Sequence, residues 1–531
     1  MGVASTGERR KIMNEDNPNQ AFEKGLGRKP NAGGDTGTRL ALDRNHLASE
    51  QTLEDFGPVN RKAQSFPSPP LAVDLDGTLV KTNLLLESLL ALLRERPQYL
   101  FLLPVWLLKG KAHLKQQVAS RVSLDVTVLP YRDGFLDYLR AQRAEGRFIV
   151  LATGGDGKFA RQVADHLKLF DLVCASDGKT NLAGESKRDR LVREFGEKGF
   201  DYAGDARRDL VVWSSARKAI VVNLGPFLSS RAAKVAAVDR IFKDRRKGFV
   251  DHLKALRPHH WVKNLLVFVP LLAAHRFEDT KLIGKTLLAF VAFGCLASAG
   301  YLLNDLFDVS SDRHHPRKRL RPFAAGDLSI SYALGMIPVL VCLGCVISAL
   351  VSPLLLAVAC IYFGMSITYS VYARQIVLLD VIVLAGLYAL RIVGGSAAVA
   401  VWPSPWLLAF STFLFFSLAL AKRYSELAIN HVKARSYELS DQELLAAMGV
   451  ASGYVAVLVL ALYINTATAH ILYRRYGLLW FLCPLLLYWI SHIWLSAHRG
   501  MMLEDPIVFS ASDRTSRILM ILMAAAIAFA L

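Results

Sequence analysis

The chain has 531 residues, of which 53% are hydrophobic, and its formal net charge is +18. This length predicts more than one domain. An excess of Lys and Arg is typical of proteins that bind nucleic acids or anionic membrane surfaces. Because membrane-grade apolar runs dominate from about residue 261 onward, the composition favours a membrane protein that binds anionic lipids and excludes a nucleic-acid binder.

The first 65 residues are polar and show no apolar periodicity. Such a composition cannot bury a core, so residues 1–65 are predicted to be a disordered tail. The pair Arg9-Arg10 is not followed by an apolar segment, so no signal peptide is expected. The N-terminal part should therefore stay in the cytoplasm.

Short apolar runs alternate with helical segments over residues 66–225. Five of them have the pattern of buried strands, at 71–75, 148–152, 172–174, 202–204 and 219–222. Strands that alternate with helices predict an α/β domain with a parallel sheet. Ligands of such a sheet bind at the carboxyl ends of the strands.

Two acids follow the first of these strands, in the run Asp74-Leu75-Asp76-Gly77-Thr78. At this position one acid can attack a substrate while the other transfers protons. Further polar residues end later strands or begin a helix, namely Thr153, Lys187, Asp205 and Asp209. In this order, the motifs resemble those of the haloacid dehalogenase-like (HAD) phosphatases.

The HAD resemblance implies a Rossmann-like fold with a helical cap. Asp74 would be the nucleophile that forms an aspartyl-phosphate, and Asp76 would be the general acid and base. Thr153 and Lys187 would hold the phosphoryl oxygens. The Mg²⁺ ligands would be drawn from Asp74, Asp76, Asp205 and Asp209.

An apolar run at residues 99–108, flanked by Lys109 and Lys111, lies between the first two strands. It is too short to span a bilayer. Two interpretations stay open. The run is either a cap helix that packs on the phosphatase core or a segment that dips into the membrane interface, which would suit a lipid-linked substrate.

Residues 226–256 are strongly basic, with apolar residues such as Val238 and Ile241 between the charges. The pattern predicts a basic amphipathic linker helix that lies on anionic headgroups. A solvated linker helix is the alternative.

Residues 257–531 contain about nine apolar segments of the ~20-residue length that spans a bilayer. Their centres lie near Val269, Ala292, Pro338, Ala359, Leu384, Phe413, Val457, Leu486 and Ala524. Most of the basic loops alternate onto one side, which the positive-inside rule makes cytoplasmic. The sequence thus predicts an all-α, multi-pass bundle in the cytoplasmic membrane, with the N-terminal domain on the cytoplasmic side.

The run Asn304-Asp305-x-x-Asp308-x-x-x-Asp312 ends one of these apolar segments. On a helix, this spacing puts the three carboxylates on one face. Bilayers disfavour ionised side chains, so acids at a helix end mark function or face water. Hard oxygen ligands suit Mg²⁺, which completes its shell with substrate phosphates. The pattern predicts a magnesium-diphosphate site at the membrane surface.

The same run matches the NDxxDxxxD motif of the UbiA-type intramembrane prenyltransferases, and the resemblance covers about residues 251–531. Ordinary members carry a second DxxxD in the following half. Here a single acid, Asp380, stands in that region, near Arg374. Fewer carboxylates give less capacity for a second Mg²⁺ on a prenyl diphosphate.

Three further segments resemble the decaprenyl-phosphate phosphoribosyltransferase branch of that family. They are Arg257-Pro258-x-x-Trp261-x-Lys263-Asn264, His315-Pro316-x-Lys318-Arg319-x-Arg321-Pro322 and Glu504-Asp505-Pro506 with Asp513-Arg514. The branch implies 5-phosphoribosyl 1-diphosphate (PRPP) as the donor and a polyprenyl phosphate as the acceptor.

The resemblance implies that Asp305, Asp308 and Asp312 bind Mg²⁺, with Asp305 and Asp308 as catalytic residues. The substrate phosphates would be held by Asn304 and by cations, because Arg in particular binds phosphate oxygens bidentately. These cations are Lys263, Lys318, Arg319, Arg321, Arg374, Arg391, Lys422 and Arg423.

Together the two halves suggest a bifunctional enzyme. The membrane half would make a polyprenyl-phospho-5-phosphoribose, and the HAD half would remove its 5-phosphate, which supplies a lipid-linked pentose for glycan synthesis. One alternative is a conventional UbiA prenyltransferase that moves a prenyl group to an aromatic acceptor beside a separate phosphatase. Another is a phosphatase that the bundle merely anchors.

Overall fold

The computed structural model describes residues 66–244, 248–430, 437–502 and 505–531. The tail predicted for residues 1–65 lies outside the described residues, as does Glu504.

The soluble part is built on one parallel sheet of six strands in the order β3-β2-β1-β4-β5-β6. The strands are β1 (Leu71–Val73), β2 (Ile149–Asp156), β3 (Leu172–Ser176), β4 (Asp201–Gly204), β5 (Lys218–Val222) and β6 (Ala237–Phe242). The first five confirm the strands expected from the sequence. β1 is completely buried at the centre of the sheet, which explains its uninterrupted apolar run.

The sixth strand corrects the expectation of an amphipathic linker over residues 226–256. This segment instead forms α8 (Pro226–Val235), then β6, which pairs in parallel with β5, and finally α9 (Phe249–Ala255). An edge strand has only one neighbour, and charged residues on it prevent further pairing. The basic composition of residues 226–256 therefore predicted a helix where the structure has a strand. Phe242 of this strand packs against Phe135 and Tyr138.

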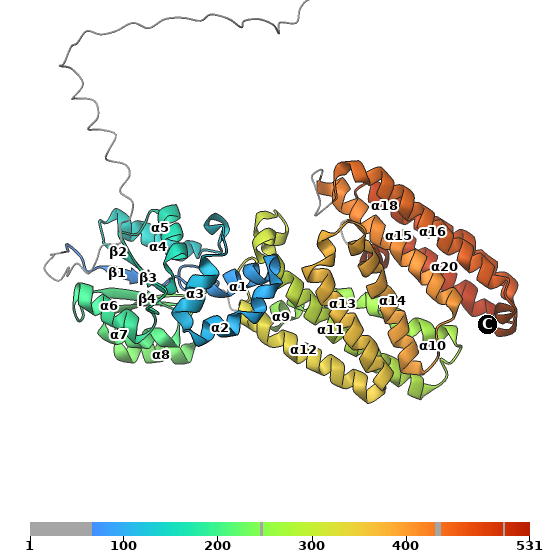
Figure 1. Cartoon of the computed structure of the whole chain (residues 1–531), viewed down its shortest axis with the longest axis horizontal. Coiled ribbons are helices and arrows are strands. Elements are labelled where there is room, and N and C mark those ends of the chain that lie inside the picture. The colour runs from blue at the N-terminus through green and yellow to red at the C-terminus, as the bar shows by residue number, and fades with distance from the viewer. Residues whose placement is uncertain (1–65, 245–247, 431–436, 503–504) are drawn as a thin grey trace, which may run out of the picture. The chain divides into compact units, whose positions relative to one another are not determined.

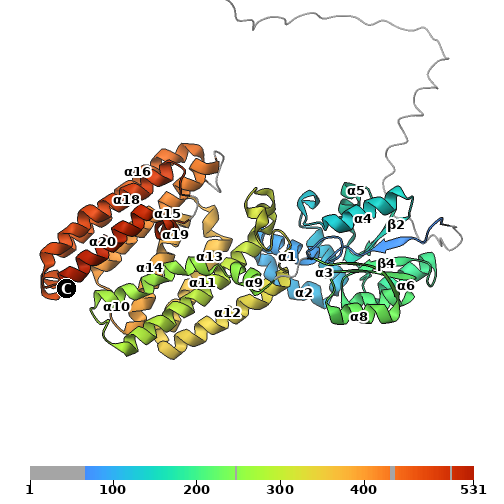
Figure 2. The ribbon, with the colours of Figure 1, turned by 180° about the vertical axis from the view of Figure 1, so that it is seen from behind.

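Helices cover both faces of the sheet (Figures 1 and 2). α4 (Asp133–Ala144) and α5 (Gly157–Leu167) share one apolar core, whereas α6 (Glu185–Phe195), α7 (Leu210–Ser215) and α8 share the other. Between β1 and β2 the chain forms a cap of α1 (Leu84–Glu95), η2 (Pro97–Phe101), α2 (Leu103–Leu108) and α3 (Lys111–Ala119). Asn83 caps the start of α1 by accepting a hydrogen bond from the Leu86 backbone.

The second part is all helical. After α9 come η5 (Pro258–Phe268), α10 (Val269–Ala273), α11 (Thr280–His314), η6 (Lys318–Leu320), α12 (Ile330–Val351), α13 (Pro353–Val371), η7 (Ala373–Gln375), α14 (Leu379–Val399), α15 (Pro405–Asn430), α16 (Gln442–Ile464), α17 (Ala467–Leu472), η9 (Tyr476–Phe481), α18 (Leu482–His498), α19 (Pro506–Ser512) and α20 (Arg514–Ala530). Within the described ranges, seven helical segments are long and apolar enough to cross a membrane. They contain seven of the nine expected centres.

The other two expected centres lie in shorter elements. Val269 begins α10, a helix of five residues, and Ala524 lies in α20, which has 17 residues. The prediction of a multi-pass helical bundle is confirmed, and the number of spans is seven by length and composition among the described helices.

Close helix contacts in this bundle depend on small residues. A Cβ atom on Gly395 of α14 would lie 2.0 Å from the carbonyl oxygen of Val267 in η5. Only glycine allows this approach of the two backbones, and close approach is how helices associate in a membrane.

Candidate active sites

The first site lies at the carboxyl ends of β1 and β4, where the topology of the sheet places ligands. Asp74 follows β1, and Asp205 and Asp209 follow β4. Each of the three offers a carboxylate oxygen within 4.8 Å of the others. Oxygen ligands of this kind are what Mg²⁺ requires, so these three acids fit a metal ion. Asp76 lies outside this cluster.

A chain of polar contacts orients the acids. Lys187 Nζ lies 3.0 Å from Asp74 Oδ1 and donates to the Tyr202 hydroxyl at 2.8 Å. That hydroxyl donates to Asp209 Oδ1 at 2.8 Å, while Asp209 Oδ2 accepts hydrogen bonds from the backbone of Asp205 and Ala206. Asp209 thus holds the loop that carries Asp205, and Lys187 reaches the expected nucleophile.

The electrostatics of this cluster also fit a cation. Burial raises the pKa of Asp74 to about 6, against the opposing effect of Lys187. Burial raises the pKa of Asp205 to about 7, and repulsion from Asp74 and Asp209 adds to this shift. A bound cation would relieve this repulsion and favour the ionised carboxylates.

The remaining predicted HAD residues, Asp76 and Thr153, accept hydrogen bonds from nearby backbone groups. Asp76 Oδ1 accepts a hydrogen bond from the Leu84 backbone at 2.8 Å, at the start of α1. The Thr153 hydroxyl accepts a hydrogen bond from the Gly155 backbone at 2.9 Å. Gly77 has a φ of +80°, and a Cβ there would lie 2.0 Å from Asp205 Oδ2. Glycine is therefore required after Asp76 if Asp205 is to reach the site.

Sequence reasoning missed Lys115 of α3. Its Nζ donates to the Gly154 carbonyl at 2.5 Å and to Asn181 Oδ1 at 2.7 Å, and it lines a small cavity with Gly155 and Asp156. The cap therefore supplies a cation beside the loop that follows Thr153, an expected phosphoryl-binding residue. No motif spacing could reveal it, because the cap residue meets the loop only in the folded chain.

The second site is the acidic motif, which lies in the last turns of α11. In this structure arginines contact all three carboxylates. Arg257 Nη2 donates to Asp305 Oδ1 at 2.5 Å, and Arg321 donates to Asp312 at 2.7 Å and to Asp305 at 3.4 Å. Arg374 donates to both oxygens of Asp308, at 2.8 and 3.0 Å.

Asn304 supplies a further argument for a ligand at this motif. Its Oδ1 is buried and has no hydrogen-bond partner within the described part of the chain. Buried polar atoms of native proteins are nearly always satisfied. Asn304 precedes Asp305 directly and lies one helical turn before Asp308, so its unpaired carbonyl oxygen fits the shell of a hydrated Mg²⁺ that also carries substrate phosphates.

A second polar cluster is centred on the buried carboxylate of Asp505. Lys263 Nζ lies 2.8 Å from it and Lys422 Nζ 3.3 Å, and the Tyr388 hydroxyl donates at 2.7 Å. In a neighbouring contact, Arg391 donates to Asn264 Oδ1 at 2.8 Å. Three of the predicted phosphate-binding cations, Lys263, Lys422 and Arg391, are therefore buried or half-buried here. Asp505, which had no predicted role, contacts the two lysines.

Arg423 has a different environment. It is fully buried and donates to Asp380, to Glu426 at 2.6 Å and to the Tyr369 hydroxyl at 2.6 Å. The second oxygen of Asp380 accepts from the Tyr437 hydroxyl at 2.6 Å. This network ties α14 to α15. Lys318 and Arg319, by contrast, are exposed in η6.

Comparison with known proteins identifies the family. The UbiA prenyltransferase family matches residues 265–505. The uncharacterized protein y4nM of Sinorhizobium fredii is 34% identical over 509 residues, which cover 94% of this chain and 96% of that protein. The chain belongs to the UbiA prenyltransferase family.

Two further relatives cover less of the chain. Nodulation protein NoeC of Azorhizobium caulinodans is 37% identical over 287 residues, which are 53% of this chain and 93% of NoeC. The decaprenyl-phosphate phosphoribosyltransferase of Corynebacterium glutamicum is 35% identical over 210 residues, which are 38% of this chain and 63% of that enzyme. The UbiA resemblance is confirmed, and the chain joins this transferase domain to the α/β domain that carries the HAD-like motifs, here called the HAD domain.

Among solved structures, a substrate-bound phosphoserine phosphatase covers 36% of this chain, at 16% identity and a TM-score of 0.24. The match includes 99% of the phosphatase chain.

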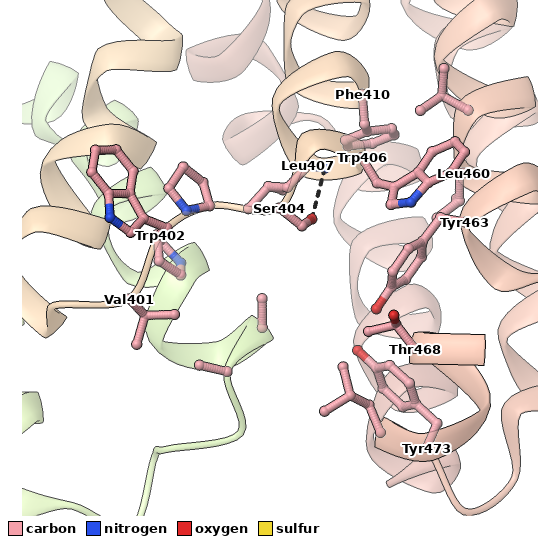
Figure 3. Close-up of a pocket in the computed structure, with 16 residues that line it drawn as sticks. Val401, Trp402, Ser404, Trp406, Leu407, Phe410, Leu460, Tyr463, Thr468 and Tyr473 are labelled. Carbon is pink, nitrogen blue, oxygen red and sulfur yellow. Dashed lines mark hydrogen bonds between the residues drawn. The ribbon is translucent and has the colours of Figure 1, made fainter. Parts of the chain in front are cut away.

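The UbiA domain also contains an apolar cavity of about 270 Å³. Trp402 and Trp406 line it together with Tyr463 and Tyr473, and none of its 16 lining residues is charged (Figure 3). The cavity adjoins Val401, just past the end of α14, whereas Asp380 stands at the start of that helix, about 30 Å away along its axis. An uncharged cavity at this distance does not belong to the phosphate-binding machinery.

Helix α1 of the HAD domain contacts the UbiA motif helix. Glu87 forms an ion pair with Arg313 through hydrogen bonds of 2.8 and 2.5 Å, and both side chains are only 5% exposed. Arg94 donates to the Phe307 carbonyl at 2.8 Å and lies 3.7 Å from Asp308. Since the start of the same helix donates to Asp76, α1 touches residues of both candidate sites.

Proposed function

We propose that the UbiA domain transfers 5-phosphoribose from PRPP to a polyprenyl phosphate and that the HAD domain removes the 5-phosphate of the product. Both sites would lie on the cytoplasmic side of the inner membrane, with Mg²⁺ as the cofactor of each. In this arrangement η5 with α10, and α20, would complete a bundle of nine spans. The 35% identity to a decaprenyl-phosphate phosphoribosyltransferase supports this choice of substrates.

The observation that carries the proposal is the state of Asp380. A prenyl diphosphate enzyme with two acidic motifs needs carboxylates in its second half to bind metal. Here both oxygens of Asp380 are buried and already accept hydrogen bonds, from Arg423 and Tyr437. Breaking such a buried pair is strongly unfavourable. One acidic motif surrounded by cations suits one diphosphate on a sugar and one phosphate on the acceptor.

In the transfer reaction, the bond between ribose C1 and the diphosphate oxygen breaks, and pyrophosphate leaves with the electron pair. An oxygen of the polyprenyl phosphate forms the new bond to C1. Mg²⁺ held by the α11 aspartates would neutralise charge on the leaving group. Arg257, Arg321 and Arg374 now contact those aspartates, so they stand where the diphosphate would arrive and can turn to its oxygens. The acceptor oxygen is already ionised and needs no general base.

In the hydrolase reaction, Asp74 attacks the phosphorus of the 5-phosphate and forms an aspartyl-phosphate. Asp76 gives a proton to the departing ribose O5′ and then takes one from the water that hydrolyses the intermediate, which releases inorganic phosphate. Lys187, Thr153 and Lys115 surround the phosphoryl group with donors. Mg²⁺ at the acid cluster would offset the charge of nucleophile and phosphate together.

A substrate screen tests the transferase assignment. The purified protein in lipid vesicles is given Mg²⁺, polyprenyl phosphate and labelled PRPP, and the lipid fraction is analysed for label. We expect a labelled lipid-linked pentose. A parallel reaction contains a labelled prenyl diphosphate and an aromatic acceptor. Label transfer in that reaction alone, with PRPP inert, would instead establish a conventional prenyltransferase.

The Asp74→Asn variant tests the coupling of the two domains. It removes the nucleophile but not the transfer site, so the lipid-linked 5-phosphoribose should accumulate and the dephosphorylated form should vanish. Mass spectrometry of the lipid products measures both. The matched control is Asp165→Asn, an exposed aspartate on α5 of the same domain. Unchanged dephosphorylation by Asp74→Asn would defeat the hydrolase assignment.

A further inference from the structure

The cap segment formed by η2 and α2 has one buried face. Trp106 is only 7% exposed and belongs to the apolar core of the HAD domain. Its ring lies 5.5 Å from that of Tyr99, and the Arg121 guanidinium stands 5.0 Å above it. The segment is therefore fixed on the cap, as the first of the two sequence interpretations requires.

The opposite face of the same segment is apolar and exposed. Phe101 is 80% exposed and Leu108 is 88% exposed. The full set of exposed large apolar side chains here is Leu100, Phe101, Leu102, Val105, Leu107 and Leu108. Six such residues within nine positions exceed the scattered exposed apolar residues of a normal protein surface.

The charge around this face is of one sign. Between Arg96 and Leu124 the chain contains no Asp or Glu, whereas it contains Arg96, Lys109, Lys111, Lys115 and Arg121. Lys109 and Lys111 directly follow the apolar face and are exposed. Apolar residues bordered by Lys and Arg are the pattern of segments that lie in the interface of an anionic membrane.

We propose that this exposed face, from Leu100 to Leu108, inserts into the interface of the anionic membrane that the UbiA domain spans. The segment is then both a cap helix and a membrane-interface segment. Trp106 packs it on the phosphatase core, and Phe101 and Leu108 on its other face enter the lipid. The insertion does not depend on the proposed reactions, because it uses only the exposed side chains and the charge of the cap.

The insertion has a consequence for the phosphatase. α2 packs on α3, and α3 carries Lys115, whose Nζ contacts Gly154 and Asn181 beside the cleft. A cap held in the membrane interface keeps this wall of the cleft at the lipid surface. A phosphate attached to a lipid then reaches Asp74 without leaving the bilayer; this step rests on the proposed function.

Spin labelling of the full chain tests the insertion. A nitroxide is attached at Leu108→Cys in a variant without the six native cysteines, which are all free thiols. The labelled protein is reconstituted in vesicles of phosphatidylglycerol and phosphatidylcholine. The matched control is Phe227→Cys on α8, which replaces another apolar side chain that is 70% exposed and lies beside a basic residue, Arg231.

The label at 108 should collide with oxygen dissolved in the lipid severalfold more often, relative to a water-soluble nickel complex, than the label at 227. Vesicles of phosphatidylcholine alone should reduce this difference. Free nickel access at 108 would overturn the proposal. Spin–spin broadening at 108 that disappears on dilution with unlabelled protein would also overturn it, because a second copy of the chain would then cover the face.

A second measurement uses the protein with its native cysteines, so the proposal can still be tested if the cysteine-free variant does not fold. Hydrogen exchange over residues 97–109 of the unmodified protein should be slower in phosphatidylglycerol nanodiscs than in phosphatidylcholine nanodiscs. The variant Phe101→Asp/Leu108→Asp should lose this difference while it still hydrolyses p-nitrophenyl phosphate. Equal exchange in both nanodiscs would contradict insertion.

Discussion

The Asp305→Asn variant is expected to reduce transfer of labelled pentose to lipid by roughly 10²–10³-fold. Asp305 is buried on α11 and is the carboxylate that both Arg257 and Arg321 contact. An amide of the same shape cannot neutralise Mg²⁺, so the charge of the departing pyrophosphate is less well stabilised. Calorimetry of the solubilised variant with Mg²⁺ and PRPP should show weakened uptake alongside the lost turnover.

Asp279→Asn is the matched control for this variant. Asp279 caps the other end of the same helix, accepting hydrogen bonds from the backbone of Lys281 and Leu282. Asn is an equally good cap, so helix stability and activity should be preserved. Undiminished transfer by Asp305→Asn would rule out a metal-binding role for the motif in the reaction.

Local sequence patterns predicted those strands that are buried on both faces of the sheet. β1, the first four residues of β2 and the last four residues of β5 are buried and appear as uninterrupted apolar runs. β6 was missed because it is a largely exposed edge strand that carries Asp239 and Arg240 and lies in a basic segment, so that its sequence is similar to that of an amphipathic helix. α10 and α20 were expected as full spans because hydropathy does not show where a helix begins or ends.

The acids of the α11 motif could be predicted because their spacing is local, and those of the first site because the HAD-like motifs follow one another in order along the chain. The partners of neither set could be predicted. Asp305, Asp308 and Asp312 lie within one helix, so helical periodicity alone puts them on one face. Among the described residues, however, only Asp74, Asp205 and Asp209 bring three carboxylate oxygens within 4.8 Å of one another. Arg94 and Lys115 reach the two sites from the cap, and nothing in their local sequence marks them. Arg423 was expected to bind phosphate, yet it is fully buried against Asp380. The sequence could not distinguish the two roles, because an arginine in a membrane helix has the same local pattern in either.

The Arg313→Met variant is expected to destabilise the contact between α1 and α11 by about 3–5 kcal/mol. Glu87 would lose two hydrogen bonds in a buried position and keep only the one from the Thr82 hydroxyl, at 2.6 Å. An unpaired buried carboxylate costs far more than a surface one. Thermal unfolding in detergent, with hydrogen exchange in α1, measures the loss.

The control pair for Arg313 is Arg140 and Asp137, whose side chains are 59% and 70% exposed. Arg140→Met should change stability by less than about 1 kcal/mol, since exposed ion pairs contribute little.

The double variant Arg313→Met/Glu87→Leu should recover most of the loss, because apolar residues can replace a buried pair at little cost. A double variant as unstable as Arg313→Met alone would show that Glu87 is not the reason for the instability. Since α1 also begins with the backbone donor to Asp76, the single variant should lower phosphatase turnover as well, and the double variant should restore it.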